Sequence, residues 1–470
     1  MTASENPLPL SRDELLALVA ALRRQLTELT AHNEALRAEI EQLKRRDKRQ
    51  AAPFSKGTRV AQPKRPGRKP GTGSFCYRAP PLPDQMTALP VDVPVRLAVC
   101  PDCGGHLLAE RIDLASTTDL PALPRPTVTP YRVAVCRCIL CGKHVRGQHP
   151  DVAPDQYGAT AHRVGARAMA AAHALHYGVG LPVRKVPLVL EALTGVQVTQ
   201  GAITQDALRR AQDSVGTAYD QLRTAVPEQP VVHTDDTGWR VGGTPAYLMA
   251  FETDGATVYQ IRSQHRHEEV QEVIPVTYEG VMVTDRGRSY DAQAFARVKQ
   301  QKCLAHILRS ISEVLQTKKG RARDFGEQLK GRLQDAIQLW RGYRARTVPD
   351  FGTEAQRLRD AITHHLRDRC LIDPDNQRLL NPMGRHHDRG NLLRFLEDPS
   401  IEPTNNRAER VLRPAVIARK VSQCSKNEPG AQAFAAFTSV VRTLAKQGVR
   451  SLVEGLYDLF RSAKIQRASP

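Results

Sequence analysis

The chain has 470 residues and is 41% hydrophobic, which is enough apolar material for several cores, so we expect three or four modules. Lys and Arg number 68 against 49 Asp and Glu, which gives a formal charge of +19 and a pI near 9.8. This balance favours a polyanionic partner, DNA or RNA first, although a generally basic solvated surface is the alternative. A cationic and then apolar leader is missing, as is an apolar run of roughly 18 residues, so we expect a cytoplasmic, nucleoid-associated protein.

Leucine recurs at every seventh position near the N-terminus, which predicts a coiled coil (a leucine zipper) over residues 1–48. The d positions are Leu15, Leu22, Leu29, Leu36 and Leu43, and the a positions are Val19, Leu26, Asn33 and Ile40. A polar Asn33 at an a position specifies a parallel two-stranded pairing, so we expect a homodimer or a higher oligomer. An isolated amphipathic helix packed on its own protein is the alternative.

Residues 49–95 form a basic segment rich in Pro and Gly, which predicts a linker without regular structure. Such a linker binds phosphates without sequence specificity. The candidate DNA-binding residues in it are Lys64, Arg65, Arg68 and Lys69. The stretch from Arg65 could enter a narrow minor groove, and a plain solvated linker is the equal alternative.

Five of the nine cysteines lie between residues 100 and 141, which predicts a zinc-binding module over residues 96–150. Two C-x-x-C-G turns can place four thiolates tetrahedrally around a structural Zn²⁺. The expected ligands are Cys100, Cys103, Cys138 and Cys141. Cys136 is an alternative ligand, and a redox-active cysteine pair is the rival interpretation.

Residues 151–228 are rich in alanine and are expected to be helical. Two helices over residues 183–193 and 199–211, with a turn at Gly195, favour a helix-turn-helix that binds DNA, although short paired helices are common.

The hydrophobic period changes in residues 229–425, where short β-prone runs occur at residues 231–234, 247–252, 257–262 and 281–284. From about residue 300 to 398 the sequence is helical again. This pattern predicts an α/β core with a helical insertion, followed by a C-terminal helical segment at residues 426–470. The whole chain is therefore expected to be a multidomain α+β protein.

Aspartates follow two of the expected strands. Asp235 and Asp236 lie where the first strand is expected to end in a Gly turn, and Asp285 follows the run at residues 281–284. Side chains alternate along a strand, so only one of Asp235 and Asp236 can face a site shared with Asp285. Either aspartate could also make only the local hydrogen bonds that are common in turns.

A third acid, Glu409, is expected on a helix that begins after Thr404 as N-cap and ends at Pro414. Asn405 lies one turn before Glu409 on the same face. Alone, Glu409 could be the partner of Arg413 in an ordinary surface ion pair.

Together, the three acids suit two Mg²⁺ ions, or Mn²⁺, because metal-assisted phosphoryl transfer needs carboxylates that bridge and flank two ions about 3.5 to 4 Å apart. Basic residues that could hold DNA phosphates surround them in the sequence: Arg286, Arg288, Arg407, Arg410, Arg413, Arg419 and Lys420. Of these we take Arg410, Arg413, Arg419 and Lys420 as candidate DNA-binding residues.

The motifs, in order, resemble those of bacterial transposases of the insertion-sequence-sixty-six type, a family of DDE transposases. They are His-Thr-Asp-Asp-Thr-Gly-Trp-Arg from His233, Val-Thr-Asp-Arg-Gly-x-Ser-Tyr from Val283, Cys303-Leu-Ala-His306, Phe395-Leu-Glu-Asp, and Thr-Asn-Asn-Arg-Ala-Glu-Arg-x-Leu-Arg-Pro from Thr404. The resemblance implies a ribonuclease-H-like core in which Asp235, Asp285 and Glu409 are the catalytic acids. It also implies that Cys303 and His306 are structural.

We therefore expect a transposase that binds the inverted repeats of its own element, cleaves the DNA strand and transfers it to target DNA. Companion proteins encoded by the same element are further candidate partners. A non-enzymatic dimeric zinc-containing DNA-binding regulator and a nuclease that cuts without joining are the alternatives.

Overall fold

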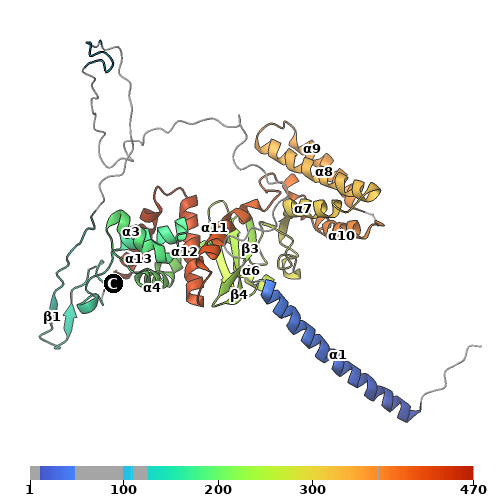
Figure 1. Ribbon diagram of the computed structural model, residues 1–470, viewed down its shortest axis with the longest axis horizontal. Coiled ribbons are helices and arrows are strands. Elements are labelled where there is room, and N and C mark those ends of the chain that lie inside the picture. The colour runs from blue at the N-terminus through green and yellow to red at the C-terminus, as the bar shows by residue number, and fades with distance from the viewer. Residues whose placement is uncertain are drawn as a thin grey trace, which may run out of the picture. The chain divides into compact units, whose positions relative to one another are not determined.

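The structure is a computed structural model that describes residues 11–47, 99–106, 108, 125–149, 151–153, 155–367 and 370–468 (Figure 1). The chain divides into two compact units, Met1–Tyr77 and Arg78–Pro470. The described part of the first unit is a single long helix, α1 (Arg12–Asp47). The expected coiled-coil segment is thus helical over its described residues.

The second unit has a mixed α+β fold, as the sequence predicts. Its described strands are β1 (Val135–Arg137), β2 (His144–Arg146), β3 (Val231–Val241), β4 (Thr244–Glu252), β5 (Thr257–Arg262), β6 (Val281–Thr284) and β7 (Lys299–Lys302). Its described α-helices are α2 (Ala166–His173), α3 (Val186–Thr194), α4 (Gln200–Ala211), α5 (Ser214–Ala225), α6 (His267–Gln271), α7 (Leu304–Leu315), α8 (Gly320–Arg344), α9 (Phe351–Leu366), α10 (Pro374–Asp388), α11 (Asn406–Ser422), α12 (Glu428–Lys446) and α13 (Leu452–Ala468).

Five strands form one sheet in the order β5-β4-β3-β6-β7. The hairpin strands β3, β4 and β5 are antiparallel, whereas β6 and β7 run parallel to β3. Strand β3 is therefore central, and its carboxyl-terminal half extends past the end of β6, because their pairing stops at His233 and Val283. The end of β6 thus lies beside Thr234 of β3, one residue before Asp235.

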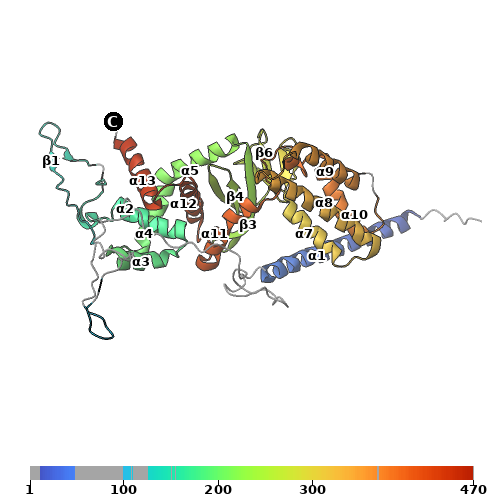
Figure 2. The same cartoon turned by 90° about the horizontal axis from the view of Figure 1, so that it is seen from above.

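Apolar clusters cover both faces of this sheet. On one face, Leu248 and Ala250 of β4 pack with residues of α11 and α12. On the other, Met249 and Phe251 pack with residues of α6 and of the segment before β7. Figures 1 and 2 show α2 to α5, α12 and α13 gathered at one end of the sheet and α7 to α10 at the other.

Both edge strands are covered, so their backbone groups do not face solvent unpaired. At the β5 edge, the backbone N–H of Tyr259 donates to the hydroxyl of Ser439 on α12 at 2.8 Å. At the β7 edge, the backbone N–H of Lys302 donates to the carbonyl of Asn391 at 2.7 Å.

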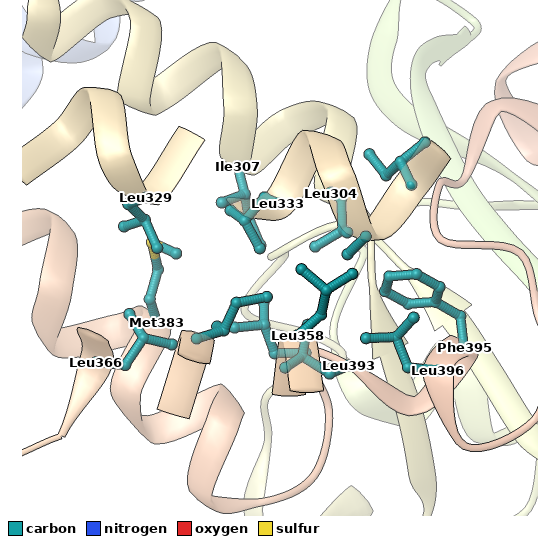
Figure 3. Close-up of a cluster of buried hydrophobic side chains, with 14 of the residues drawn as sticks. Leu304, Ile307, Leu329, Leu333, Leu358, Leu366, Met383, Leu393, Phe395 and Leu396 are labelled. Carbon is teal, nitrogen blue, oxygen red and sulfur yellow. The ribbon is translucent and has the colours of Figure 1, made fainter. Parts of the chain in front are cut away.

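The segment between β7 and α11 contains the helices α7 to α10, which share one core with β6 (Figure 3). Leu304 and Ile307 of α7 face Leu333 of α8, and Met383 of α10 lies near Leu329. Val281 and Val283 of β6 belong to the same cluster. The helical insertion is therefore packed directly on the strand that precedes Asp285.

Two expected element ends were wrong, and one strand was missed. Strand β3 does not end at the aspartates but continues to Val241, because its pairing with β4 extends to Val241 and Thr244. Helix α11 does not end at Pro414 but continues to Ser422. Strand β7 was not expected at all, because its residues Lys-Gln-Gln-Lys are polar although the last three are buried.

Pro414 costs a helix interior about 3 kcal/mol. In α11 the neighbours Leu412 and Ala415 are buried in the cluster under the sheet, and this packing offsets the cost. Among the helices in the described part of the chain, none is both long and apolar enough to cross a membrane.

Candidate active site

Asp235 lies in the middle of β3 and faces α11. It pairs across the strands with Ala250, which packs against α11 and α12, and paired residues share a face of the sheet. Asp236 pairs with Met249, which belongs to the cluster on the opposite face. The two aspartates therefore face opposite sides, as the alternation predicts, and the side chain directed toward Glu409 is that of Asp235.

Asp285 follows β6 directly, where the parallel strand ends. Its Oδ1 accepts a hydrogen bond of 2.7 Å from the backbone N–H of Gly287, which closes a tight turn. The hydroxyl of Thr284 donates to the carbonyl of Asp285 at 2.8 Å. The turn is thus fixed on both sides of the carboxylate.

A buried lysine lies behind this turn. Lys302 is fully buried, and its Nζ lies 2.7 Å from Oδ1 of Asp291 and donates to Thr284 at 3.1 Å. Burial lowers the pKa of Lys302, while the charges of Asp291 and Asp285 act against that shift. The second oxygen of Asp291 is 3.7 Å from His386 of α10, so the insertion reaches the strand end through this pair.

Glu409 lies in the first turn of α11, whose N-cap is Asn405 and not Thr404 as expected. The Asn405 side chain does not cap the helix but donates to the carbonyl of Thr234 on β3 at 2.8 Å. Its backbone N–H donates to the sulfur of Cys303 at 3.1 Å. Asn405 therefore ties the start of α11 to the strand that carries Asp235.

Arg407 also holds the start of α11 in place. It was expected to contact DNA phosphate, but its guanidinium contacts residues of the protein instead. Its guanidinium contacts Glu252 at 3.3 Å and Asp254 at 2.6 Å, and it donates to the carbonyl of Thr253 at 2.8 Å. Glu252 is buried and also pairs with Lys446 of α12. Arg407 is thus used inside the protein, where it holds α11 against the end of β4.

The three acids are close enough to affect one another. Burial, together with the charges of Asp285, Asp236 and Glu409, raises the pKa of Asp235 to about 7, although a hydrogen bond from the backbone N–H of Asp236 acts in the opposite direction. A buried carboxyl among other carboxylates is a common feature of functional sites. The charges of Asp285 and Glu409 therefore both act on Asp235.

Asp236 has a separate partner that sequence reasoning missed. Its Oδ1 lies 3.2 Å from Nδ1 of His265 in the loop before α6. Burial and the charge of Asp285 raise the pKa of Asp236, and His265 opposes this shift. No local spacing relates the two residues, so only the fold could reveal the pair.

The first helix of the insertion also reaches the site. Nε2 of His306 on α7 lies 3.7 Å from Oε1 of Glu409, and one turn further along, Ser310 accepts a hydrogen bond of 2.6 Å from Arg286. Cys303 is buried at the start of the same helix. Cys303 and His306 therefore contact α11 as well as supporting the fold.

A groove of about 320 Å³ lies between β3 and α11. Its lining residues are Asp235, Asp236, Thr237, Glu409, Leu412, Arg413, Val416 and Ile417. Two of the three acids thus line a surface recess that a substrate can reach.

In the described part of the chain, no three His, Cys, Asp or Glu side chains come together closely enough to hold a metal ion. The donor set around Asp235 nevertheless fits a hard divalent cation. Carboxylate oxygens are the ligands that Mg²⁺ prefers. Burial first, and then the neighbouring negative charges, raise the pKa of Asp235, and a bound cation would favour its charged form.

The cysteines form two matching turns. In each, the glycine N–H after the second cysteine donates to the carbonyl of the first, as in Gly104 to Cys100 and Gly142 to Cys138, both at 2.9 Å. Both glycines have positive φ. Hydrogen bonds from backbone amides, those of Asp102 and Cys103 in the first turn, lower the pKa of the leading cysteine in each turn.

Cys103 and Cys141 supply the second thiol of each turn. The lowered pKa values of Cys100 and Cys138 favour the thiolate form that zinc binds. The second turn lies within the hairpin of β1 and β2, and Cys136 is on β1 just before it. A single four-cysteine site remains a prediction, because the two pairs do not meet among the described residues.

Three of the basic residues expected to bind DNA are exposed on α11, namely Arg410, Arg413 and Lys420. Arg419 is half-buried and donates to Gly238 and Thr237 of β3, so it is engaged within the protein. The linker residues Lys64, Arg65, Arg68 and Lys69 lie outside the described residues.

Helices α3 and α4 lie where the helix-turn-helix was expected. Gly195, with φ of 69°, ends α3, and the Thr199 side chain caps α4 by accepting from the Ala202 N–H at 3.1 Å. The arrangement provides a helix pair; its contact with DNA stays a prediction.

Residues 162–433, more than half of the chain, match the family described as transposase IS66 family. A search of curated proteins gave no match.

Proposed function

Because the chain belongs to the transposase IS66 family, we propose that it cleaves DNA strands at the ends of its own mobile element and joins them to target DNA. The observation that supports this proposal is that Asp235 and Glu409 line one groove and that the charges of Asp285 and Glu409 both act on Asp235. The three acids come from three separate elements, yet Asp285 and Glu409 both raise the pKa of Asp235. Ordinary surface carboxylates would not be gathered in this way.

In the proposed ribonuclease-H-like core, Asp235, Asp285 and Glu409 would hold two Mg²⁺ or Mn²⁺ ions. Bound there, such ions polarise the phosphoryl oxygen and promote the ionisation of water. The protein's own part is to hold the three carboxylates in place. Asn405 and Arg407 fix the start of α11, and the turn at Gly287 fixes Asp285.

DNA would lie along the exposed side of α11. Arg410, Arg413 and Lys420 can contact its phosphates, and the linker residues before the cysteine module would add affinity without sequence specificity. In this proposal α1 joins two copies of the chain, the four-cysteine module holds a structural zinc ion, and α3 with α4 reads the inverted repeats.

The purified full chain, labelled duplexes taken from the ends of the element and Mg²⁺ test this proposal in one reaction. A 3′ end joined to target DNA is the expected product. Cut DNA without joining would instead show a nuclease. Bound but uncut DNA would favour the regulator, which needs no acids in a cleft.

A further inference from the structure

The face of α11 that carries Glu409 continues as an apolar stripe. Leu412, Val416 and Ile417 follow Glu409 at intervals of three, seven and eight residues, which places them on one side of the helix. All of them line the groove beside Asp235. The groove therefore has the carboxylates at one end and aliphatic side chains along its length.

The aliphatic side chains differ in exposure along this groove. Leu412 is 5% exposed and forms part of the core, whereas Ile417 is 57% exposed. Arg413 is exposed beside them. Ile417 is not an isolated exposed residue, because it continues the aliphatic lining of the groove from Leu412 and Val416, and an apolar groove beside acids and cations fits a binding surface.

We propose that this groove binds the nucleoside next to the scissile phosphodiester. This inference rests on the proposed function, since that function places the scissile phosphate at Asp235 and Glu409. The adjoining sugar and base then pack against Val416 and Ile417. Arg413 contacts the next phosphate along the strand.

Charge favours a nucleotide strand over a protein segment as the occupant. The exposed side chains nearest Ile417 on its own helix include Arg413 and Lys420, which are cationic. An apolar strip between cations and next to phosphate chemistry matches the alternation of sugar or base with phosphate. A protein segment or a second copy of the chain would use the apolar strip but not the cations.

Ile417→Ser tests the groove, and Val421→Ser is the matched control. Val421 is 46% exposed on the same helix but does not line the groove. Both changes remove an exposed aliphatic side chain at similar cost to the helix. Melting temperatures of the two variants show whether either one fails to fold.

Each protein is combined with an end duplex that is intact or that lacks the base on one side of the cut. Single-turnover cleavage rates and dissociation constants are measured for every combination. With intact DNA, Ile417→Ser should slow cleavage about tenfold, the scale expected when one aliphatic contact is lost, while Val421→Ser should have little effect.

Removal of the base should slow the wild-type protein by a similar factor but should slow Ile417→Ser little further. Such non-additive losses show that the Ile417 side chain and the DNA base contact each other. Independent, multiplying losses would overturn the proposal, as would equal effects of the two variants. Ile417→Ser could also change the sedimentation of the protein while leaving its cleavage rates on both duplexes at the wild-type values. That result would assign the groove to a protein partner and would also overturn the proposal.

Failure of the proposed function gives a different result. If the wild-type protein cuts no DNA, that function fails, and the dissociation constants of the same combinations still decide the groove. A base-dependent affinity that Ile417→Ser abolishes supports the groove, and an affinity independent of the base contradicts it.

Discussion

For two neighbouring aspartates on β3, part of the side-chain orientation could be predicted from the sequence. Alternation along the strand predicts that Asp235 and Asp236 face opposite sides, and the pairing with Ala250 and Met249 agrees. Alternation alone does not say which side the site occupies. That choice came from the resemblance to a family and stays a prediction. Asp235 faces α11, and the charge of Glu409 is one of the causes of its raised pKa.

Amide substitutions of Asp235, Asp285 and Glu409 test whether these carboxylates are catalytic. Asp235→Asn, Asp285→Asn and Glu409→Gln keep the side-chain shape but each removes one negative charge. Strand cleavage should fall by several orders of magnitude for any one of them, because the acids act as a unit. Binding of end DNA should stay level or rise, since repulsion of phosphate is removed.

Asp236→Asn is the matched control for these three variants, with at most a modest loss of cleavage expected. Asp236 also lines the groove, but its carboxylate contacts His265, so this change removes that contact and leaves the three acids intact. If Asp236→Asn abolished cleavage and Asp235→Asn did not, the assignment would be one residue out of register. Cleavage by all three acid variants would place the active site elsewhere.

A pH dependence of stability follows from the pKa of Asp235, which burial and neighbouring acids raise to about 7. An unfolded Asp has a pKa near 3.9, so between roughly pH 4 and 7 the folded protein binds more protons. Without divalent ions its stability should therefore fall as the pH rises through this range, by at most about 1.4 kcal/mol per pH unit.

Asp235→Asn should lack this contribution. The melting temperature of the variant relative to wild type should therefore rise from about pH 5 to about pH 8. Adding Mg²⁺ should reduce the difference, because the cation competes with the proton for the carboxylate. A constant difference at every pH would contradict the raised pKa.

At the scale of elements, sequence patterns located buried apolar strands and missed polar ones. The run of Val and Met at residues 281–284 was recognisable, and β6 occupies those residues. Strand β7 was not recognisable, because the buried polar residues Gln300 and Gln301 make hydrogen bonds to Asn391 and Leu392, which lie about 90 residues away in the sequence. Long-range contacts of this kind leave no local pattern.

Removing one or the other partner of the Lys302–Asp291 ion pair should change the free energy of unfolding by different amounts. Lys302 is fully buried, whereas the Asp291 side chain is 33% exposed. Asp291→Ala should destabilise the protein by about 3 to 5 kcal/mol, because it leaves a buried ammonium without its partner. Lys302→Met should cost much less, since it places an apolar side chain in the same space and Asp291 retains contact with water.

Urea unfolding of the two variants and of the double variant checks this order. The double variant Lys302→Met with Asp291→Ala should be more stable than Asp291→Ala alone, because no buried charge remains. The reverse order of the single variants would mean that Lys302 is not the desolvated partner.

The cysteine turns make a prediction about zinc. Changing Cys100 and Cys138 to Ser should lower bound zinc from about one ion per chain to near none and should unfold residues 96–150, because a four-ligand site contributes folding energy directly. Zinc content by atomic absorption is the measurement. Full retention of zinc in this double variant would contradict a zinc site that has Cys100 and Cys138 as ligands.

Cys136→Ser is the matched control, since Cys136 lies on β1 and was the alternative ligand. It should retain the zinc ion. Loss of zinc in this variant would instead assign Cys136 to the ligand set.

At the scale of the whole molecule, the order of segments could be predicted from changes of composition and period. The fold of the second unit depends on contacts between distant segments, such as Asn405 with Thr234 and Arg407 with Glu252, which no local pattern shows. For this reason the contacts that position the candidate site residues could not be predicted from the sequence, and the roles of those residues stay a prediction.

Helix α1 has an apolar seam that is exposed among the described residues of its own unit. Leu22, Leu26 and Leu29 are 53%, 70% and 62% exposed, although they occupy d and a positions of the heptads. Exposed leucines at this spacing favour burial against a second copy of the same helix. Dimerisation would then hold two element ends and two sets of acids in one assembly.

Deletion of residues 1–43 should weaken self-association and the binding of end DNA while the fold of the rest of the chain persists. A matched pair of variants tests the seam itself: Leu26→Asn with Leu29→Asn on the seam, and Arg24→Asn with Ala31→Asn at the outer f positions. Both pairs place Asn in the helix at similar cost, but only the first removes seam contacts. Sedimentation should show a loss of dimer for the deletion and for the seam pair, and no loss for the outer pair. If the truncated chain associates as strongly as the whole chain, the dimer contact lies outside α1.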